Sequence, residues 1–142
     1  MSMQKKSKAG FTLVELMVVA IIVAILAAVA IPLMSGNKKR AAATEAEAAL
    51  GTVRSALRAV LAETAAYNVT PSGGSIANGA AANTVPGISA GDLNGKYWAE
   101  GNYVVTTIGT SNYLLTASGG TGIVSGVSIT LDQAGTFVRS GL

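Results

Sequence analysis

The sequence contains neither cysteine nor histidine among its 142 residues. Without cysteine, the chain has no disulfide bond and no thiol chemistry. Without histidine, it lacks the usual general base and the usual zinc ligand. Its carboxylates show no spacing that indicates catalysis, and its serines and threonines have no evident activating base. We therefore expect a structural protein and not an enzyme, with no cofactor and no bound metal.

Charged side chains are also scarce, at 12% of the sequence, and the net charge is +3. This excess comes from Lys5, Lys6 and Lys8, which precede Gly10 in a stretch without any acid. If residues 1–10 form a removable leader, seven basic side chains remain against seven acidic ones. The basic cluster that remains, residues 38–40, is smaller than the basic face that polyanion binding requires. Nucleic acid is therefore not an expected partner, and we interpret the cluster as a solvated collar or a subunit contact.

A long apolar run begins directly after the leader. Residues 16–34 contain no charged or strongly polar side chain, and as a helix they would extend about 28 Å, close to the hydrocarbon thickness of a bilayer. Glu15, at the start of the run, is the only charge in residues 11–35. A carboxylate that faces hydrocarbon costs several kcal/mol, so such a residue usually has a function and a partner. We expect residues 11–35 to form a transmembrane and polymerisation helix.

The helix is expected to continue beyond this run. Proline removes a helical hydrogen bond, so Pro32 and Gly36 predict a kink or a locally melted segment, but the strong helix formers that follow argue against a helix end. Residues 36–67 are predicted to form an amphipathic half that ends near Tyr67. The full helix would extend about 84 Å, too far for one small domain to bury. The predicted apolar stripe of the amphipathic half is Ala46, Leu50, Val53, Leu57, Val60 and Leu61.

The C-terminal half predicts a loop followed by a sheet. Residues 68–102 are rich in glycine, alanine and asparagine, which indicates a long variable loop. Residues 103–142 contain short runs of β-branched and aromatic residues between turn signals, typical of an antiparallel meander. These runs are residues 103–108, 112–117, 127–131 and 136–138. We therefore predict an α+β fold, in which one long N-terminal helix, kinked near Pro32, packs on a small antiparallel sheet of three or four strands.

Two weaker signals in this half have ordinary structural interpretations. Asp92, Glu100 and Asp132 are too dispersed to indicate a calcium site. The glycines within residues 120–126 lack the spacing of a phosphate-binding loop, and no helix is predicted after them. We expect a hairpin loop there.

The order Gly-Phe-Thr-Leu-Val-Glu-Leu at residues 10–16 resembles the processing site of the type IV pilin and pseudopilin family. A secretory signal peptide with small residues at 27–30, or a plain membrane anchor, would explain the basic leader and the apolar run. Neither explains a glutamate at the start of that run. The short leader and the phenylalanine at position 11 look like the type IVa branch. Many pilins carry a disulfide near the C-terminus, and this chain departs from that pattern.

The resemblance implies a processing and assembly route. Prepilin peptidase would cleave between Gly10 and Phe11, and the new amine of Phe11 would be methylated. Glu15, then the fifth residue, would pair with the Phe11 amine of a neighbouring subunit. Pro32 and Gly36 fall where the family's helix can lose its hydrogen bonds in a filament.

The resemblance also implies a function. The chain would be a structural subunit of a type IV pilus, held in the inner membrane as prepilin and then polymerised into a cell-surface filament. Its partners would be further copies of itself, prepilin peptidase, an inner-membrane assembly platform and an assembly ATPase. The alternative is a pseudopilin of a type II secretion system, and a remoter one is a monomer anchored in the membrane. Since major pseudopilins can hold calcium in their C-terminal loops, the dispersed acids favour the pilus.

Overall fold

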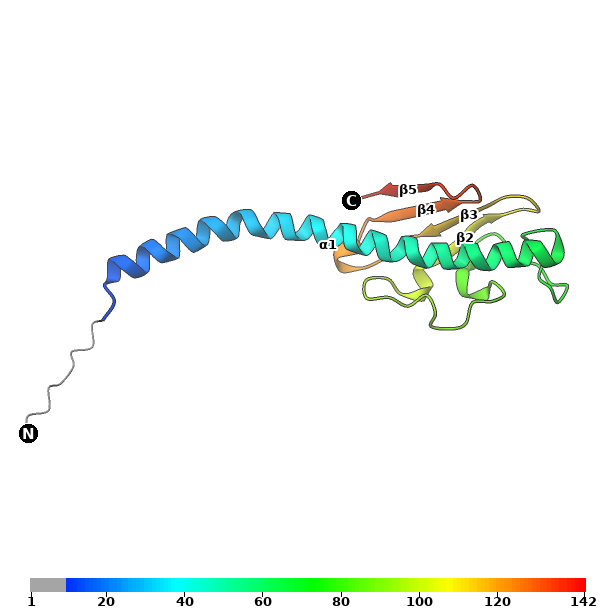
Figure 1. The fold of residues 1–142 in the computed structure, drawn as a ribbon, viewed down its shortest axis with the longest axis horizontal. Helices are drawn as coiled ribbons and strands as arrows, with labels where there is room; N and C mark the ends of the chain where they lie inside the picture. The colour runs from blue at the N-terminus through cyan, green and yellow to red at the C-terminus, as the bar shows by residue number, and fades with distance from the viewer. Residues whose placement is uncertain (1–9) are drawn as a thin grey trace, which may run out of the picture. The chain divides into compact units, whose positions relative to one another are not determined.

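The computed structural model describes residues 10–142, so the predicted basic leader with Lys5, Lys6 and Lys8 lies outside the described residues. The described backbone divides into two compact units, with the boundary between Ser35 and Gly36. One α-helix, α1 at Leu13–Thr64, contributes to both (Figure 1). It is helical without a break at Pro32 and Gly36, so neither residue ends the helix, as expected. Melting of this segment in a filament stays a prediction.

The second unit contains an antiparallel sheet with the strand order β1-β2-β3-β4-β5. The four predicted C-terminal strands are present (Figure 1). A fifth strand, β1, lies in the predicted loop and pairs with β2, so the sheet is one strand wider than the upper limit we expected. The strands are β1 Ala80–Ala81, β2 Tyr103–Ile108, β3 Tyr113–Ala117, β4 Ser128–Asp132 and β5 Phe137–Ser140. Three short 3-10 helices lie between them, at Ala82–Thr84, Glu100–Asn102 and Gly122–Val124.

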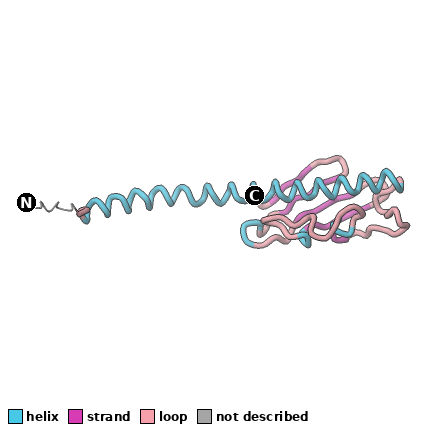
Figure 2. Tube along the Cα trace, turned by 60° about the horizontal axis from the view of Figure 1, so that its bottom comes forward, coloured by secondary structure: helices cyan, strands magenta, loops and turns pink. Residues whose placement is uncertain are grey.

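The core of this unit lies between the helix and one face of the sheet (Figure 2). The predicted stripe is buried except for Leu61, which is partly buried. The sheet side of the core includes every second residue of β4, because successive side chains of a strand point to opposite faces. The strand residues in the core are Tyr103, Val105, Ile108, Tyr113, Leu115, Ala117, Ile129 and Leu131, with Val127 just before β4.

The segment between the helix and β2 is tied to the helix at two points. The carboxylate of Glu45 accepts hydrogen bonds from the backbone N–H groups of Tyr97 and Trp98, at 2.9 and 3.0 Å. The indole N–H of Trp98 donates to the backbone carbonyl of Ala42 at 2.8 Å. A Cβ atom at Gly95 would clash with the Glu45 carboxylate, so the close approach requires glycine. The irregular segment is therefore anchored by specific contacts.

The helix ends at Thr64, earlier than the predicted end near Tyr67. Ala65 adopts a left-handed conformation with φ of 61°, a conformation that interrupts an α-helix. The Thr64 hydroxyl donates to the backbone carbonyl of Val60 or Ala66, at 2.8 and 2.7 Å. Tyr67 instead packs edge-on against Tyr113, with 4.8 Å between ring centroids. The sequence pattern missed this end because alanine is a strong helix former.

Candidate functional site

The predicted cleavage point, between Gly10 and Phe11, lies two residues before the helix, which begins at Leu13. Gly10, Phe11 and Thr12 have no helical or strand structure. A Cβ atom at Gly10 would meet no other atom within 4 Å, and the Phe11 side chain is 85% exposed. The peptide bond between Gly10 and Phe11 is therefore accessible in the isolated chain. Cleavage at that bond stays a prediction.

Glu15 and Thr12 form a reciprocal cap at the start of the helix. The Glu15 carboxylate accepts hydrogen bonds from the Thr12 backbone N–H and the Thr12 hydroxyl, both at 2.9 Å. The Thr12 hydroxyl oxygen also lies 3.2 Å from the Glu15 backbone N–H, which donates to it. This arrangement is a capping box, in which side chains satisfy backbone N–H groups that have no partner within the helix. The charge of Glu15 therefore has a local partner in the single chain.

Phe11 of a neighbouring subunit is the predicted partner of Glu15, and Thr12 is a partner that the prediction missed. A threonine three residues before a glutamate, directly ahead of an apolar run, is the sequence signature of a capping box. That signal was present at residues 12–15. Pairing of Glu15 with a second chain stays a prediction, because one chain is described.

The helix that follows Glu15 has an apolar surface without a partner. Every residue from Leu16 to Met34 is exposed, and the large side chains are between 50% and 69% exposed. By length and composition the helix is apolar enough to cross a membrane. No residue of its most apolar segment is buried. An apolar surface this continuous is typical of a membrane span or a protein interface.

The three acidic residues considered for a calcium site accept hydrogen bonds from backbone N–H groups, and two of them, Asp92 and Glu100, bind within the same stretch of residues 89–92. Asp92 accepts a hydrogen bond from the Ser89 backbone N–H at 2.8 Å, and Glu100 accepts one from Gly91 at 2.9 Å. Asp132 accepts from the backbone N–H groups after it, at 2.9 and 2.8 Å. Within residues 10–142, acidic side chains do not gather into a group of three. These carboxylates stabilise loop conformations.

Two buried tyrosines lie at the interface of helix and sheet. Burial, together with a smaller effect of the nearby Glu45 carboxylate, raises the pKa of Tyr103 to about 12. Burial also raises the pKa of Tyr113. Among the described residues, the Tyr103 hydroxyl has no hydrogen-bond partner. Both side chains therefore serve as packing residues, which agrees with their place in the core.

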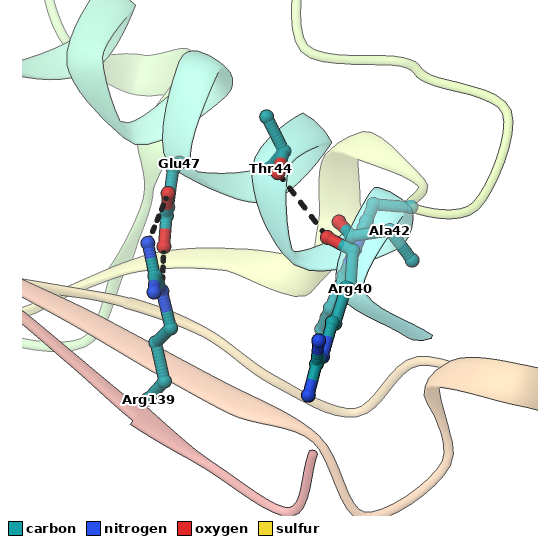
Figure 3. A network of polar contacts seen from close by, with 6 residues as sticks. Arg40, Ala42, Thr44, Glu47 and Arg139 are labelled. Carbon is teal, nitrogen blue, oxygen red and sulfur yellow. Dashed lines mark hydrogen bonds and ion pairs between the residues drawn. The ribbon is translucent and has the colours of Figure 1, made fainter. Parts of the chain in front are cut away.

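An ion pair joins the last strand to the helix. Arg139 of β5 donates two hydrogen bonds to the Glu47 carboxylate, one of them at 2.9 Å from Nη2 to Oε2 (Figure 3). The hydrogen bond to Glu47 raises the pKa of Arg139. Because both groups are partly exposed, the pair contributes little to stability. It does fix Arg139 beside the helix.

Comparison with known proteins gives a family model and a related protein, each of which matches only part of the chain. Residues 5–31 match the family model described as the prokaryotic N-terminal methylation motif. The type II secretion system core protein G of Aeromonas hydrophila is 51% identical over 39 residues, which cover 28% of this chain and 27% of that protein. No solved structure matches the chain significantly.

The two matches point to a structural subunit, and proteins of this kind are not enzymes. The motif and the apolar helix fit insertion into the inner membrane. The second unit adds the expected layout of a long helix packed on an antiparallel sheet. The methylation motif and the similarity to core protein G support the predicted resemblance to the type IV pilin and pseudopilin family.

Proposed function

We propose that this chain is a structural subunit of a type IV pilus. It enters the inner membrane as a prepilin, loses residues 1–10 to prepilin peptidase, and is methylated at the amine of Phe11. It then polymerises through its N-terminal helix into a cell-surface filament. An inner-membrane platform receives the subunit, and an assembly ATPase supplies the energy for its extraction.

One observation carries this proposal: a motif for N-terminal methylation covers residues 5–31, and every residue from Leu16 to Met34 of the helix is exposed. Lipid covers this surface before assembly, and neighbouring helices cover it in the filament. Because both surroundings are apolar, the hydrophobic stabilisation is largely kept during the transfer. The second unit buries its own core and needs no such cover.

Glu15 determines how the helix packs against its neighbours after it moves from lipid into the filament. In the single chain its carboxylate is held by Thr12, and in the filament it pairs with the methylated ammonium of a neighbouring Phe11. A buried carboxylate and a buried ammonium satisfy each other, whereas either one alone is strongly destabilising. The pair therefore favours one register between adjacent helices. The helix near Pro32 and Gly36 adjusts to that packing by losing hydrogen bonds.

Mass spectrometry of the N-terminus tests the processing step. The mature chain is expected to begin at Phe11 and to carry a methyl group on its amine. A Gly10→Leu variant is expected to keep residues 1–10. The leucine would place a bulky side chain directly before the bond that the peptidase cleaves. A mature N-terminus at any residue other than Phe11 would contradict the proposal.

A second candidate, a pseudopilin of a type II secretion system, is favoured by the similarity to core protein G. That similarity extends over 39 residues, 28% of this chain and 27% of core protein G, which does not separate the two kinds of subunit. The pilus is preferred because Asp92, Glu100 and Asp132 do not gather into a group of three among the described residues, as a calcium-holding loop would require. Electron microscopy of cells with and without the gene separates the two candidates. Long fibres that contain this chain support the pilus, and a secretion defect without fibres supports the pseudopilin.

A further inference from the structure

A group of cations lies at the start of the second unit, directly after the apolar run. Lys38, Lys39 and Arg40 follow one another on the helix, and Arg139 of β5 is held beside the same helix by Glu47. Four cationic side chains and one carboxylate leave this surface with a net positive charge. We name these four residues the basic collar.

Two of the four cations of the collar, Lys38 and Arg40, are available for a ligand, whereas Arg139 is bound to Glu47. Lys38 and Arg40 are exposed, and within residues 10–142 neither forms an ion pair. Lys39 donates a long hydrogen bond of 3.4 Å to the backbone carbonyl of Gly141. In Figure 3 the guanidinium of Arg40 points away from Glu47, which is already bound to Arg139.

A shallow cavity lies within the collar, between the helix and the C-terminal strand. Its volume is about 390 Å³, and it is lined by Arg40, Ala43, Thr44, Arg139 and Leu142. Two arginine side chains therefore border one hollow. Arginine presents a planar fork of N–H donors that matches the oxygens of a phosphate group.

The position of the collar along the helix matches the depth of lipid phosphates. Lys38 lies four residues and Arg40 six residues after Met34, the last residue of the apolar run. At 1.5 Å per residue these side chains begin about 6 and 9 Å beyond the end of that run. The polar headgroup layer of a bilayer occupies the first several ångströms outside the hydrocarbon.

From charge and depth together we propose that the basic collar binds the phosphate groups of anionic phospholipids, with one headgroup in the cavity between Arg40 and Arg139. This inference rests on the proposed membrane-inserted stage of the subunit, but it does not depend on the filament. The contact holds the second unit against the headgroup layer until the subunit is extracted. Removing the subunit from the membrane then requires breaking these phosphate contacts as well as moving the helix.

Native mass spectrometry of the full chain tests the proposal. The chain is placed in detergent micelles that contain equal amounts of phosphatidylglycerol and phosphatidylcholine, and the lipid molecules that remain bound are identified. We expect phosphatidylglycerol to be retained in preference. Arg40→Gln is expected to weaken its binding about fivefold, and Lys38→Gln with Arg40→Gln about 25-fold, because each cation near an anionic headgroup contributes a similar amount. The emission of Trp98, the one tryptophan of the chain, reports whether each variant is folded.

Arg58→Gln is the matched control, since Arg58 is an exposed arginine on the same helix far from the apolar run. It removes the same charge and is expected to leave the lipid preference unchanged. Equal losses in Arg40→Gln and Arg58→Gln, or no preference for phosphatidylglycerol in the wild type, would overturn the proposal. Complete displacement of phosphatidylglycerol by inorganic phosphate would also overturn it, because the site would then bind free phosphate and not a lipid.

A different result would identify the collar as a contact between subunits. In that case the variant with Lys38→Gln and Arg40→Gln keeps its lipid preference but no longer forms filaments, and the lipid assignment fails. Conversely, a chain that keeps its preference for phosphatidylglycerol but never forms a filament would reject the pilus and leave the collar assignment intact.

Discussion

The two halves of α1 use the same secondary structure in opposite ways. Residues 16–34 are exposed on every side, whereas the second half buries Leu50, Val53 and Leu57 completely. Both halves are rich in residues that favour a helix. The difference is the presence of a sheet that covers the second half. A helix whose apolar residues have no partner in its own chain must find one elsewhere, in lipid or in other copies.

The polar contacts of the two regions differ in the same sense. In the first region, Glu15 and Thr12 satisfy each other across three residues of sequence. In the second region, Glu45 and Glu47 bind partners that are more than fifty residues away. The first region is therefore organised by local contacts alone. The second has the long-range contacts that define a cooperative folded unit.

Deleting the first region is the strongest test of this difference. A fragment of residues 36–142 is expected to be folded, soluble and monomeric, because its core contains no residue from the first region. It is also expected to lose membrane retention and assembly completely. Size-exclusion chromatography and the emission of the buried Trp98 measure both properties. An unfolded fragment would show that the second unit depends on the first.

Matched leucine substitutions in the two halves sharpen the comparison. Leu50→Ala is expected to lower the free energy of unfolding of the second unit by about 3 kcal/mol, because it removes a fully buried side chain and leaves a cavity. Leu26→Ala, at a side chain that is 64% exposed, is expected to change it by less than about 0.5 kcal/mol. Urea unfolding of the full chain in detergent, followed by Trp98 emission, measures both. Equal effects would contradict the separation of the two regions.

The buried side chain of Tyr103 predicts that the second unit loses stability at alkaline pH. The pKa of Tyr103 is about 12 in the folded chain, above its ordinary value of 10.0. The folded state therefore keeps the Tyr103 proton to higher pH than the unfolded state does. The contribution of Tyr103 to stability is complete below pH 10 and is lost as the pH rises toward 12. The expected loss is about 2 to 3 kcal/mol.

Tyr103→Phe is expected to remove much of that alkaline loss, because the hydroxyl has no hydrogen-bond partner among the described residues. The loss that remains reflects Tyr113, whose pKa is also raised. Tyr97→Phe, at a partly exposed tyrosine, serves as the control and should leave the transition in place. Unfolding curves at pH 8, 10 and 11.5 provide the measurement. An unchanged transition in Tyr103→Phe would assign the loss to another group.

Much of this fold could be predicted from the sequence because its patterns are strong and local. The apolar run, the helical stripe and the alternation of Val127, Ile129 and Leu131 each have a clear period, and the structure confirms each element. The early end of the helix was missed because Ala65 is left-handed in spite of its helical preference. Strand β1 was missed because its two alanines, Ala80 and Ala81, have no strand preference of their own.

The contacts that position loops and charges depend on distant residues and could not be predicted. The register of β2 and β3 shifts between Val105 and Thr107, so that Ile108 faces the core. The pairing of Glu47 with Arg139 joins residues 92 positions apart, and no periodicity indicates it. At the candidate site the situation is reversed, since the cap of Thr12 on Glu15 is local. That contact could have been predicted from the spacing of a capping box alone.

The most direct test of the central claim compares two glutamates of the same helix, one in each region. Cells that express Glu15→Ala are expected to contain processed, membrane-bound subunit in normal amounts but at least about tenfold less filament, because the ammonium of the neighbouring Phe11 would be buried without a partner. Glu63→Ala removes an exposed carboxylate at the far end of the helix and is expected to leave the filament yield unchanged. Filaments of normal yield from Glu15→Ala would contradict the account.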